Sequence, residues 1–212
     1  MPLTMPEEIL LLTLDDATGR PVGLPGPAAE LALAGAMLME LSLAGRIDTD
    51  PDRLYRVAAA PLGDAVLDPL LARIGATAPE RPSRWWIESL MREVPKLRPA
   101  WLERLVQRGV LRREKGRVLW VLPDHRYPKE DGGTTEAVRE RLRHVLLQDV
   151  IPDARDAMLV GLCRIAGLVP LLLSEAEAAR AAGRVEQIAA LEEMARALSA
   201  ATRDLYAARG LH

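Results

Sequence analysis

The chain has 212 residues, of which 49% are hydrophobic and 27% charged, with one cysteine and a formal net charge of −2 at pH 7. This balance excludes a disordered chain and a disulfide-bonded scaffold, and it fits one good-sized core in a reducing compartment. The charge is uneven, because residues 81–129 carry thirteen basic and five acidic residues between two acidic segments. All four tryptophans fall in this basic block, which suggests an anionic partner.

The first long apolar stretch is LALAGAMLMELSLAGRI, residues 31–47, in which Glu40 is the first charge. A helix of this length rises about 25 Å, which is short of the roughly 30 Å hydrocarbon core of a bilayer. A carboxylate near the middle of such a span is also costly. We therefore predict a buried helix of a soluble protein over about residues 27–45, with the small residue Gly35 allowing close packing.

Apolar residues at helical spacing predict further helices on both sides of this one. They cover an N-terminal segment with Glu7 and Glu8 in its first turn, residues 65–74, residues 85–94, residues 101–110, the segment after Thr135, residues 158–169, a segment opened by the capping-box pattern Ser174–Glu177, and residues 184–208. The helix over residues 85–94 is expected to stop at Pro95, because proline lacks the N–H that a helix needs.

Two segments favour strands instead. RLYRV, residues 53–57, predicts a short strand, and VLRREKGRVLWVL predicts a β-hairpin over about residues 110–122 with its turn near Glu114-Lys115-Gly116. The predicted fold class is therefore mainly α, a single globular helical domain over residues 1–212 around a buried central helix, with one protruding β-hairpin.

The sequence offers little catalytic chemistry. The three histidines, His125, His144 and His212, are far apart and show no metal-ligand spacing. No nucleotide-binding or nucleophile-elbow motif is present. Cys163 lies in an apolar helical run and is expected to be a buried structural thiol. We expect no catalytic residue, no metal and no cofactor, and hence a protein that is not an enzyme.

The basic block supports two kinds of binding. In the first, the helix ending in LVQRGVL and the RREKGR hairpin form a winged helix–turn–helix that binds DNA. The segment that would read base edges, PKLRPAWLERL, contains two prolines and no hydroxyl residue, so binding to nucleic acid is disfavoured.

In the second, the basic face meets anionic lipid headgroups and the hairpin enters the interface. The mixture of Trp120 with a cluster of basic residues suits a headgroup boundary; these are Arg112, Arg113, Lys115 and Arg117. Each basic residue contributes about 1 kcal/mol at an anionic surface, so four or five reach only about millimolar affinity. Stable attachment would need a headgroup pocket, apolar insertion or several copies in an oligomer.

Five motifs in order resemble the Golgi phosphoprotein 3 family in its bacterial form. They are LTMPEEILLLTLDD, GAMLMELSLAGRI, APLGDAVLD, LVQRGVLRREKGRVLWV and TTEAVRERLRHVLL. The resemblance runs from about Leu3 to past Leu172 and keeps the motif order and approximate spacing. It implies a mostly helical domain with a protruding hairpin. Eukaryotic members of the family are peripheral membrane proteins that bind phosphatidylinositol 4-phosphate and act as adaptors for Golgi glycosyltransferases, so the resemblance implies a lipid-binding protein that can serve as an adaptor.

The family's headgroup pocket uses one tryptophan and three basic residues, and the resemblance places four residues of this chain at those positions. Arg98 matches a basic position, whereas Pro95 (with Lys96 adjacent), Ala34 and Pro25 depart from the pattern. In the family the hairpin is implicated in membrane contact and self-association. The positions that fall on it are Lys115, Val118, Leu119, Trp120 and Val121.

The resulting prediction is a cytoplasmic protein that is peripheral on the inner face of the membrane. Arg98, Lys96, Arg112, Arg113 and Arg117 are predicted to bind anionic phospholipid or phosphoinositide headgroups, and the hairpin is predicted to contact the membrane or a second copy of the chain. Tails of membrane proteins are further candidate partners. An adaptor between proteins that has lost lipid binding is an alternative.

Overall fold

The computed structural model describes residues 2–23, 27–118, 122–130 and 132–188, with the backbone alone over residues 115–118 and 122–125. It is mainly helical, as predicted. The helices are α1 (Met5–Leu12), α2 (Pro27–Leu43), α3 (Leu67–Ala76), α4 (Ser83–Gln107), α5 (Gly132–Leu147), α6 (Ala154–Ile165) and α7 (Val169–Leu172), followed by helical residues 175–188. The strands are β1 (Ile47–Thr49), β2 (Leu54–Arg56), β3 (Glu114–Val118) and β4 (Leu122–Arg126).

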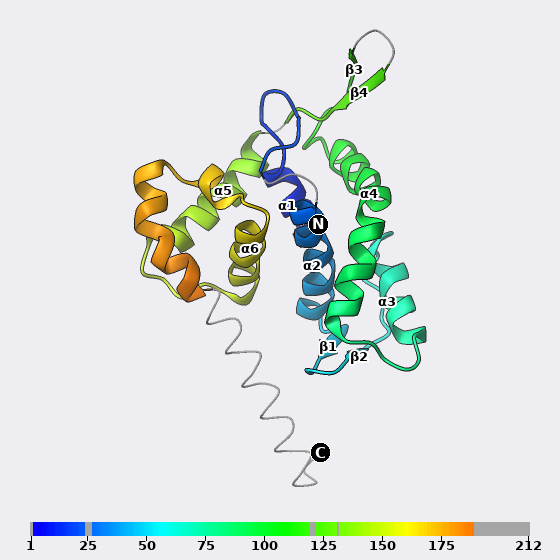
Figure 1. Ribbon diagram of the computed structural model, residues 1–212. Coiled ribbons are helices and arrows are strands. Elements are labelled where there is room, and N and C mark those ends of the chain that lie inside the picture. The colour runs from blue at the N-terminus through cyan, green and yellow to red at the C-terminus, as the bar shows by residue number, and fades with distance from the viewer. Residues whose placement is uncertain (1, 24–26, 119–121, 131, 189–212) are drawn as a thin grey trace.

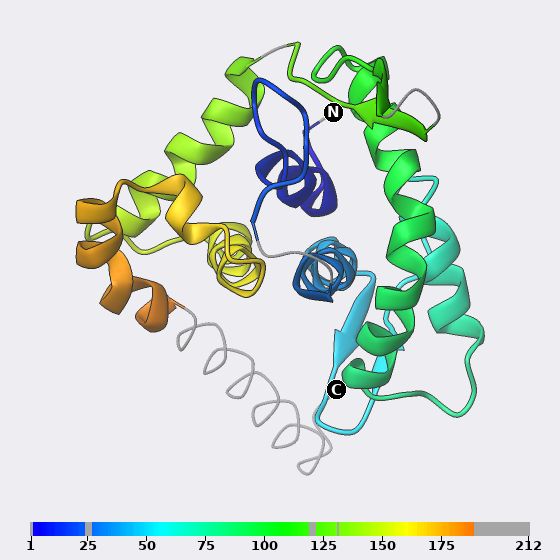
Figure 2. The same ribbon diagram turned by 45° about the horizontal axis from the view of Figure 1, so that its top comes forward.

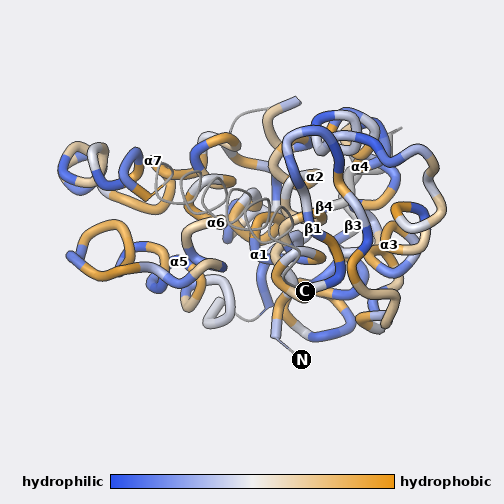
Figure 3. Tube along the Cα trace, turned by 90° about the horizontal axis from the view of Figure 1, so that it is seen from below, coloured by the Kyte–Doolittle hydropathy of each residue, from blue (hydrophilic) through white to orange (hydrophobic). Residues whose placement is uncertain are grey.

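Helices α1 and α2 lie at the centre of the molecule (Figures 1 and 2). Helix α4 packs on one side of them, with α3 outside it, and α5 and α6 pack on the other side. Hydrophobic and hydrophilic residues interleave along α5 in Figure 3, as expected of a helix with one face on a core. The central pair therefore receives apolar side chains from both sides.

Helix α2 is the predicted buried helix. Its buried side chains are Ala32, Leu33, Ala34, Ala36, Met37, Leu38 and Leu41. A Cβ added at Gly35 would lie 3.0 Å from Cδ2 of Leu162 on α6, so the predicted close packing is confirmed. The Glu40 carboxylate accepts hydrogen bonds from the backbone N–H of Met5 at 2.6 Å and from Arg155 at 3.1 Å. In the part of the chain described, no helix combines the length and the apolar character that a bilayer span requires.

Helix α4 corrects one prediction, because it runs through both Pro95 and Pro99 as a single helix of 25 residues. Each proline in a helix interior costs about 3 kcal/mol. The apolar face continues across the prolines at helical spacing, however, and its side chains are buried; they are Trp86, Leu90, Val94, Trp101, Leu102 and Leu105. Burying each contributes roughly 1.5–3 kcal/mol, and together they outweigh the two prolines.

The hairpin corrects a second prediction. Strands β3 and β4 pair antiparallel from Glu114 opposite Arg126 to Val118 opposite Leu122, so the hairpin spans residues 114–126 rather than 110–122. Glu114-Lys115-Gly116 lies in the first strand and not at the turn. The hairpin projects from one end of the molecule, beyond the end of α4 (Figure 1). The predicted strand over residues 53–57 is also present, as β2, and it pairs with β1.

The remaining helices largely follow the prediction. The α5 stripe is buried at Val138, Leu142, Val145 and Leu146. The capping box at Ser174 is confirmed, because its backbone N–H and hydroxyl both donate to Glu177 at 2.8 Å. The predicted helix over residues 184–208 is helical to Ile188, and its remainder lies outside the described residues.

Candidate functional site

Many arginines bind carboxylates inside the fold around α1. We call this group the α1 ion-pair cluster; it comprises Glu7, Glu8, Glu40, Asp64, Asp156, Arg104, Arg141 and Arg155. Arg104 donates to Glu7 at 2.7 Å and to Asp64 at 2.6 Å. Glu8, whose side chain is only 3% exposed, accepts from Arg141 at 2.7 Å and from Arg155 at 2.8 Å. The cluster joins α1 to α2, α4, α5 and α6, so these arginines connect the central helices to the elements around them.

The predicted basic residues at the foot of the hairpin are exposed but have carboxylate partners. Arg112 pairs with Glu114 at 2.8 Å, and Arg113 pairs with Glu103 of α4. Six other predicted residues lack a described side chain. Lys115, Arg117 and Val118 have only their backbone described, and Leu119, Trp120 and Val121 lie outside the described residues.

The two predicted residues on α4 do not form one site. Lys96 and Arg98 are two residues apart, which turns them about 200° around the helix. Lys96 is exposed, whereas Arg98 is half-buried. Burial lowers the pKa of the Arg98 guanidinium, and the nearby Glu30 carboxylate on α2 acts in the opposite direction. Neither side chain forms a hydrogen bond or an ion pair with a described residue.

The outer face of α4 carries a line of side chains that sequence reasoning missed. Trp85, Arg92, Lys96 and Glu103 are spaced at i, i+7, i+11 and i+18, which places them within about 20° of one line along the helix. We call these four residues the α4 stripe. The 3.6-residue period would have revealed it in the sequence, but a helix broken at Pro95 hides the register between the two halves.

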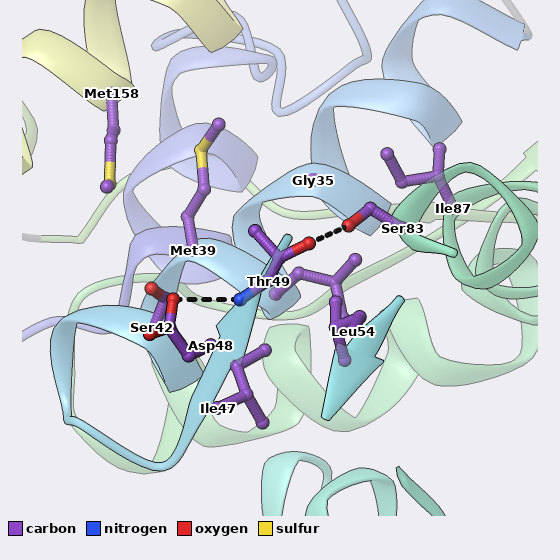
Figure 4. Close-up of a pocket in the computed structure, with 11 residues that line it drawn as sticks. Gly35, Met39, Ser42, Ile47, Asp48, Thr49, Leu54, Ser83, Ile87 and Met158 are labelled. Atoms are coloured by element: carbon purple, nitrogen blue, oxygen red, sulfur yellow. Dashed lines mark hydrogen bonds between the residues drawn. The ribbon is translucent and has the colours of Figure 1, made fainter. Parts of the chain in front are cut away.

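A small pocket lies between α2, β1 and the start of α4, next to α6. It encloses about 110 Å³, and Met39, Ile87 and Met158 line it (Figure 4). Three of its polar side chains are already hydrogen-bonded, since the Thr49 and Ser83 hydroxyls lie 2.7 Å apart and Asp48 accepts from the Thr49 N–H at 2.8 Å. None of its lining residues is basic. The pocket therefore suits an apolar group and not a phosphate.

Comparison with known proteins identifies the family to which the chain belongs. The sequence profile of the family described as Golgi phosphoprotein 3 (GPP34) matches residues 5–207. The chain belongs to the Golgi phosphoprotein 3 family. It is also similar to vacuolar protein sorting-associated protein 74 of Eremothecium gossypii, with 29% identity over 166 residues. That alignment covers 68% of this chain and 49% of the relative, so the chain spans about half the length of this curated relative.

The structure places two of the residues that depart from the family's pocket pattern. Ala34 is fully buried on α2, and Pro95 is exposed on α4. Neither adds a positive charge beside Arg98, and Glu30, one turn before Ala34, adds a negative one. Pro25 lies outside the described residues.

The described residues of this Golgi phosphoprotein 3 family member offer few groups for nucleophilic or metal-dependent chemistry. Cys163 is a fully buried free thiol, as predicted, and burial raises its pKa to about 12. A neutral buried thiol is a poor nucleophile. Over the described ranges, no three His, Cys, Asp or Glu side chains lie close enough together to hold a metal ion.

Proposed function

We propose that this protein is a non-enzymatic, peripheral membrane protein that binds anionic lipid headgroups through exposed cations on α4 and at the foot of the hairpin. The observation that carries the proposal is the placement of Lys96. It is exposed, has no carboxylate partner among the described residues, and lies in line with Glu103, which positions Arg113 beside the hairpin.

The cations contribute through charge and not through a headgroup-specific pocket. Arg112 and Arg113 keep their pairs on an exposed surface, where such pairs are worth little and exchange readily for phosphate. Arg117 and Lys115 extend the same basic run into β3. The apolar residues of the hairpin, Val118 to Val121, are proposed to give membrane contact or self-association, which would supply the affinity that charge alone lacks.

Arg98 is proposed to have a lesser role. It faces a different side of α4 and lies near Glu30, whose carboxylate would repel a phosphate. Selective recognition of phosphatidylinositol 4-phosphate is therefore not part of the proposal. The cytoplasmic face of a membrane is the proposed location, because its anionic lipids attract basic segments.

The alternative of a winged-helix DNA-binding protein is less favoured than lipid binding. The segment that would read base edges, PKLRPAWLERL, lies inside the single helix of residues 83–107 and does not open a recognition helix of its own. The following experiment distinguishes lipid binding from an adaptor that has lost it; binding to tails of membrane proteins is compatible with either result.

The test is vesicle flotation at physiological salt. Neutral vesicles, vesicles with phosphatidylserine, and vesicles with phosphatidylinositol 4-phosphate at matched charge are compared. We expect equal binding to the two anionic mixtures and none to neutral vesicles. Removing two cations, in K96Q/R113Q, should weaken binding by about 30-fold, since each contributes about 1 kcal/mol.

Two control variants sharpen the result. R180Q removes an exposed charge from the helix over residues 175–188, on the opposite side of α1 and α2 from α4, and should change binding less than twofold. R98Q should also have a small effect. A large loss in R98Q together with a preference for phosphatidylinositol 4-phosphate would replace the proposal with a specific pocket, and no flotation of the unmodified protein would refute it.

A further inference from the structure

We infer that α4 lies along the bilayer, with the α4 stripe facing the headgroups and Trp85 inserted at the headgroup boundary. This inference rests on the proposed function and assigns the orientation of the protein on the membrane. It adds Trp85, Arg92 and Arg81 to the lipid-contacting surface and makes the hairpin one end of that surface rather than the whole of it.

The stripe is a row of three exposed side chains that ends at the half-exposed Glu103. From Trp85 to Glu103 it covers 19 residues, or about 27 Å of helix. The core-facing side chains Trp86, Leu90 and Val94 occupy the opposite side of α4 and are buried. The stripe ends at the ion pair between Glu103 and Arg113, at the foot of the hairpin. The exposed side of α4 and the foot of the hairpin thus form one line of side chains.

The charge of this surface suits an anionic partner. Arg92 and Lys96 are exposed and form no hydrogen bond or ion pair with another described residue. Next to the stripe, Arg84 pairs with Glu88 at 2.8 Å, and the Arg81 guanidinium lies 5.7 Å from the centre of the Trp85 ring. With Arg113, this surface holds five cations and the carboxylates of Glu88 and Glu103, while Glu93 on the flank of the helix pairs with Arg73 at 2.8 Å.

Trp85 is the apolar group in this row of cations. Its neighbour Trp86 is buried at 1% exposure, whereas Trp85 remains 42% exposed. The two rings meet edge to face, with their centres 5.1 Å apart and their planes at 89°, so Trp86 holds the exposed ring in place. Tryptophan prefers the membrane–water interface, where its ring lies among the headgroups and neighbouring cations meet the phosphates.

The shape of the surface favours a bilayer over an acidic peptide. Peptides are bound in grooves, pockets or at sheet edges, whereas the stripe follows the convex outer side of a helix. A flat anionic surface can meet all of its cations at once. The apolar face of α4 is packed on the core, so contact with the bilayer would come from Trp85 at the headgroup boundary and from the cations beside it.

Tryptophan fluorescence tests the orientation on the full chain. Trp86 and Trp101 are buried, so quenching by vesicles of phosphatidylcholine and phosphatidylserine with brominated acyl chains reports on Trp85 and Trp120. We expect the fluorescence of W120F to remain quenched on vesicle binding, because Trp85 is still present. The fluorescence of W85F should be quenched less than that of the unmodified protein. W85A should weaken flotation about fivefold, whereas I151A, which truncates a side chain 95% exposed in the loop before α6, should not.

The outcomes separate this inference from the proposed function. Flotation of the unmodified protein with quenching that disappears in W120F and persists in W85F would overturn the orientation and leave lipid binding through the hairpin. Absence of flotation would overturn both. Circular dichroism of each variant establishes that it is folded, and W120F carries the test even if W85F is destabilised, because Trp85 is then the reporter.

Discussion

The α1 ion-pair cluster and the α4 stripe use the same residue types in opposite surroundings. In the cluster, Glu7 and Glu8 are buried, and each accepts hydrogen bonds from at least one arginine. In the stripe, Arg92 and Lys96 are exposed and bind no described carboxylate. The contrast shows that the number of arginines in a sequence says little about ligand binding until their partners are known.

The two regions also differ in energy. A buried carboxylate that loses an arginine partner leaves uncompensated charge in the interior, which is strongly destabilising. An exposed cation can be removed with almost no effect on folding, since water already solvates it. Substitutions in the cluster should therefore change stability, and substitutions in the stripe should change binding.

The largest expected effect is on membrane binding. Reversing both free cations of the stripe, in R92E/K96E, changes the surface charge by four units and should weaken flotation with phosphatidylserine vesicles by more than about 100-fold. The midpoint of urea unfolding should stay unchanged, because neither side chain contacts the core. An equal loss of stability would mean that the stripe belongs to the fold, as the cluster does.

The next effect is on stability. E8Q replaces a buried carboxylate with an amide that cannot accept the charge-assisted hydrogen bonds of both Arg141 and Arg155. Because both arginines keep a second carboxylate partner, the free energy of unfolding should fall by about 2 kcal/mol. Urea denaturation followed by circular dichroism measures it. E88Q breaks the exposed pair with Arg84 and serves as the matched control with no measurable change. Similar midpoints for E8Q and E88Q would contradict the contrast between the two regions.

The smallest effect concerns Asp16, which is half-exposed and links the turn after α1 to Arg139 of α5 and to Lys129. The Arg139 hydrogen bond lowers the pKa of Asp16 from 3.8 to about 2. Its contribution is therefore present above pH 4 and lost as the pH falls through about 2.

With allowance for solvent screening, D16N should lower the free energy of unfolding by at most about 1 kcal/mol at pH 7. This difference from the unmodified protein should shrink as the pH is lowered from 5 to 3. Urea midpoints across this range measure it. D52N, which changes an exposed carboxylate in the β1–β2 connection, is the control. A D16N deficit that is constant with pH would mean that Asp16 acts through packing rather than charge.

Local patterns were sufficient for several elements. The apolar run of α2 and the small Gly35 predict a buried helix with a close neighbour, because burial on most sides requires apolar residues on most sides. The capping box at Ser174 depends only on residues within one turn. The strand Leu54–Arg56 and the α5 stripe likewise follow from spacing alone.

Tertiary packing decided the rest. Helix α4 continues through Pro95 and Pro99 because core contacts on both sides of the prolines outweigh their local cost. The hairpin is shifted by four residues, since strand pairing depends on the partner strand and not on the turn signal of Glu114-Lys115-Gly116. The burial of Glu7 and Glu8 depends on arginines about 100 or more residues away.

The candidate site shows the same division. Composition alone determined that the middle of the chain is basic and rich in tryptophan, and the motif order indicated the family. Only the tertiary structure showed that Arg104 points inward while Lys96 stays exposed, and that Lys96 and Arg98 face different sides of one helix. Charge is a property of the sequence, but its availability to a ligand depends on which carboxylates the fold brings within reach.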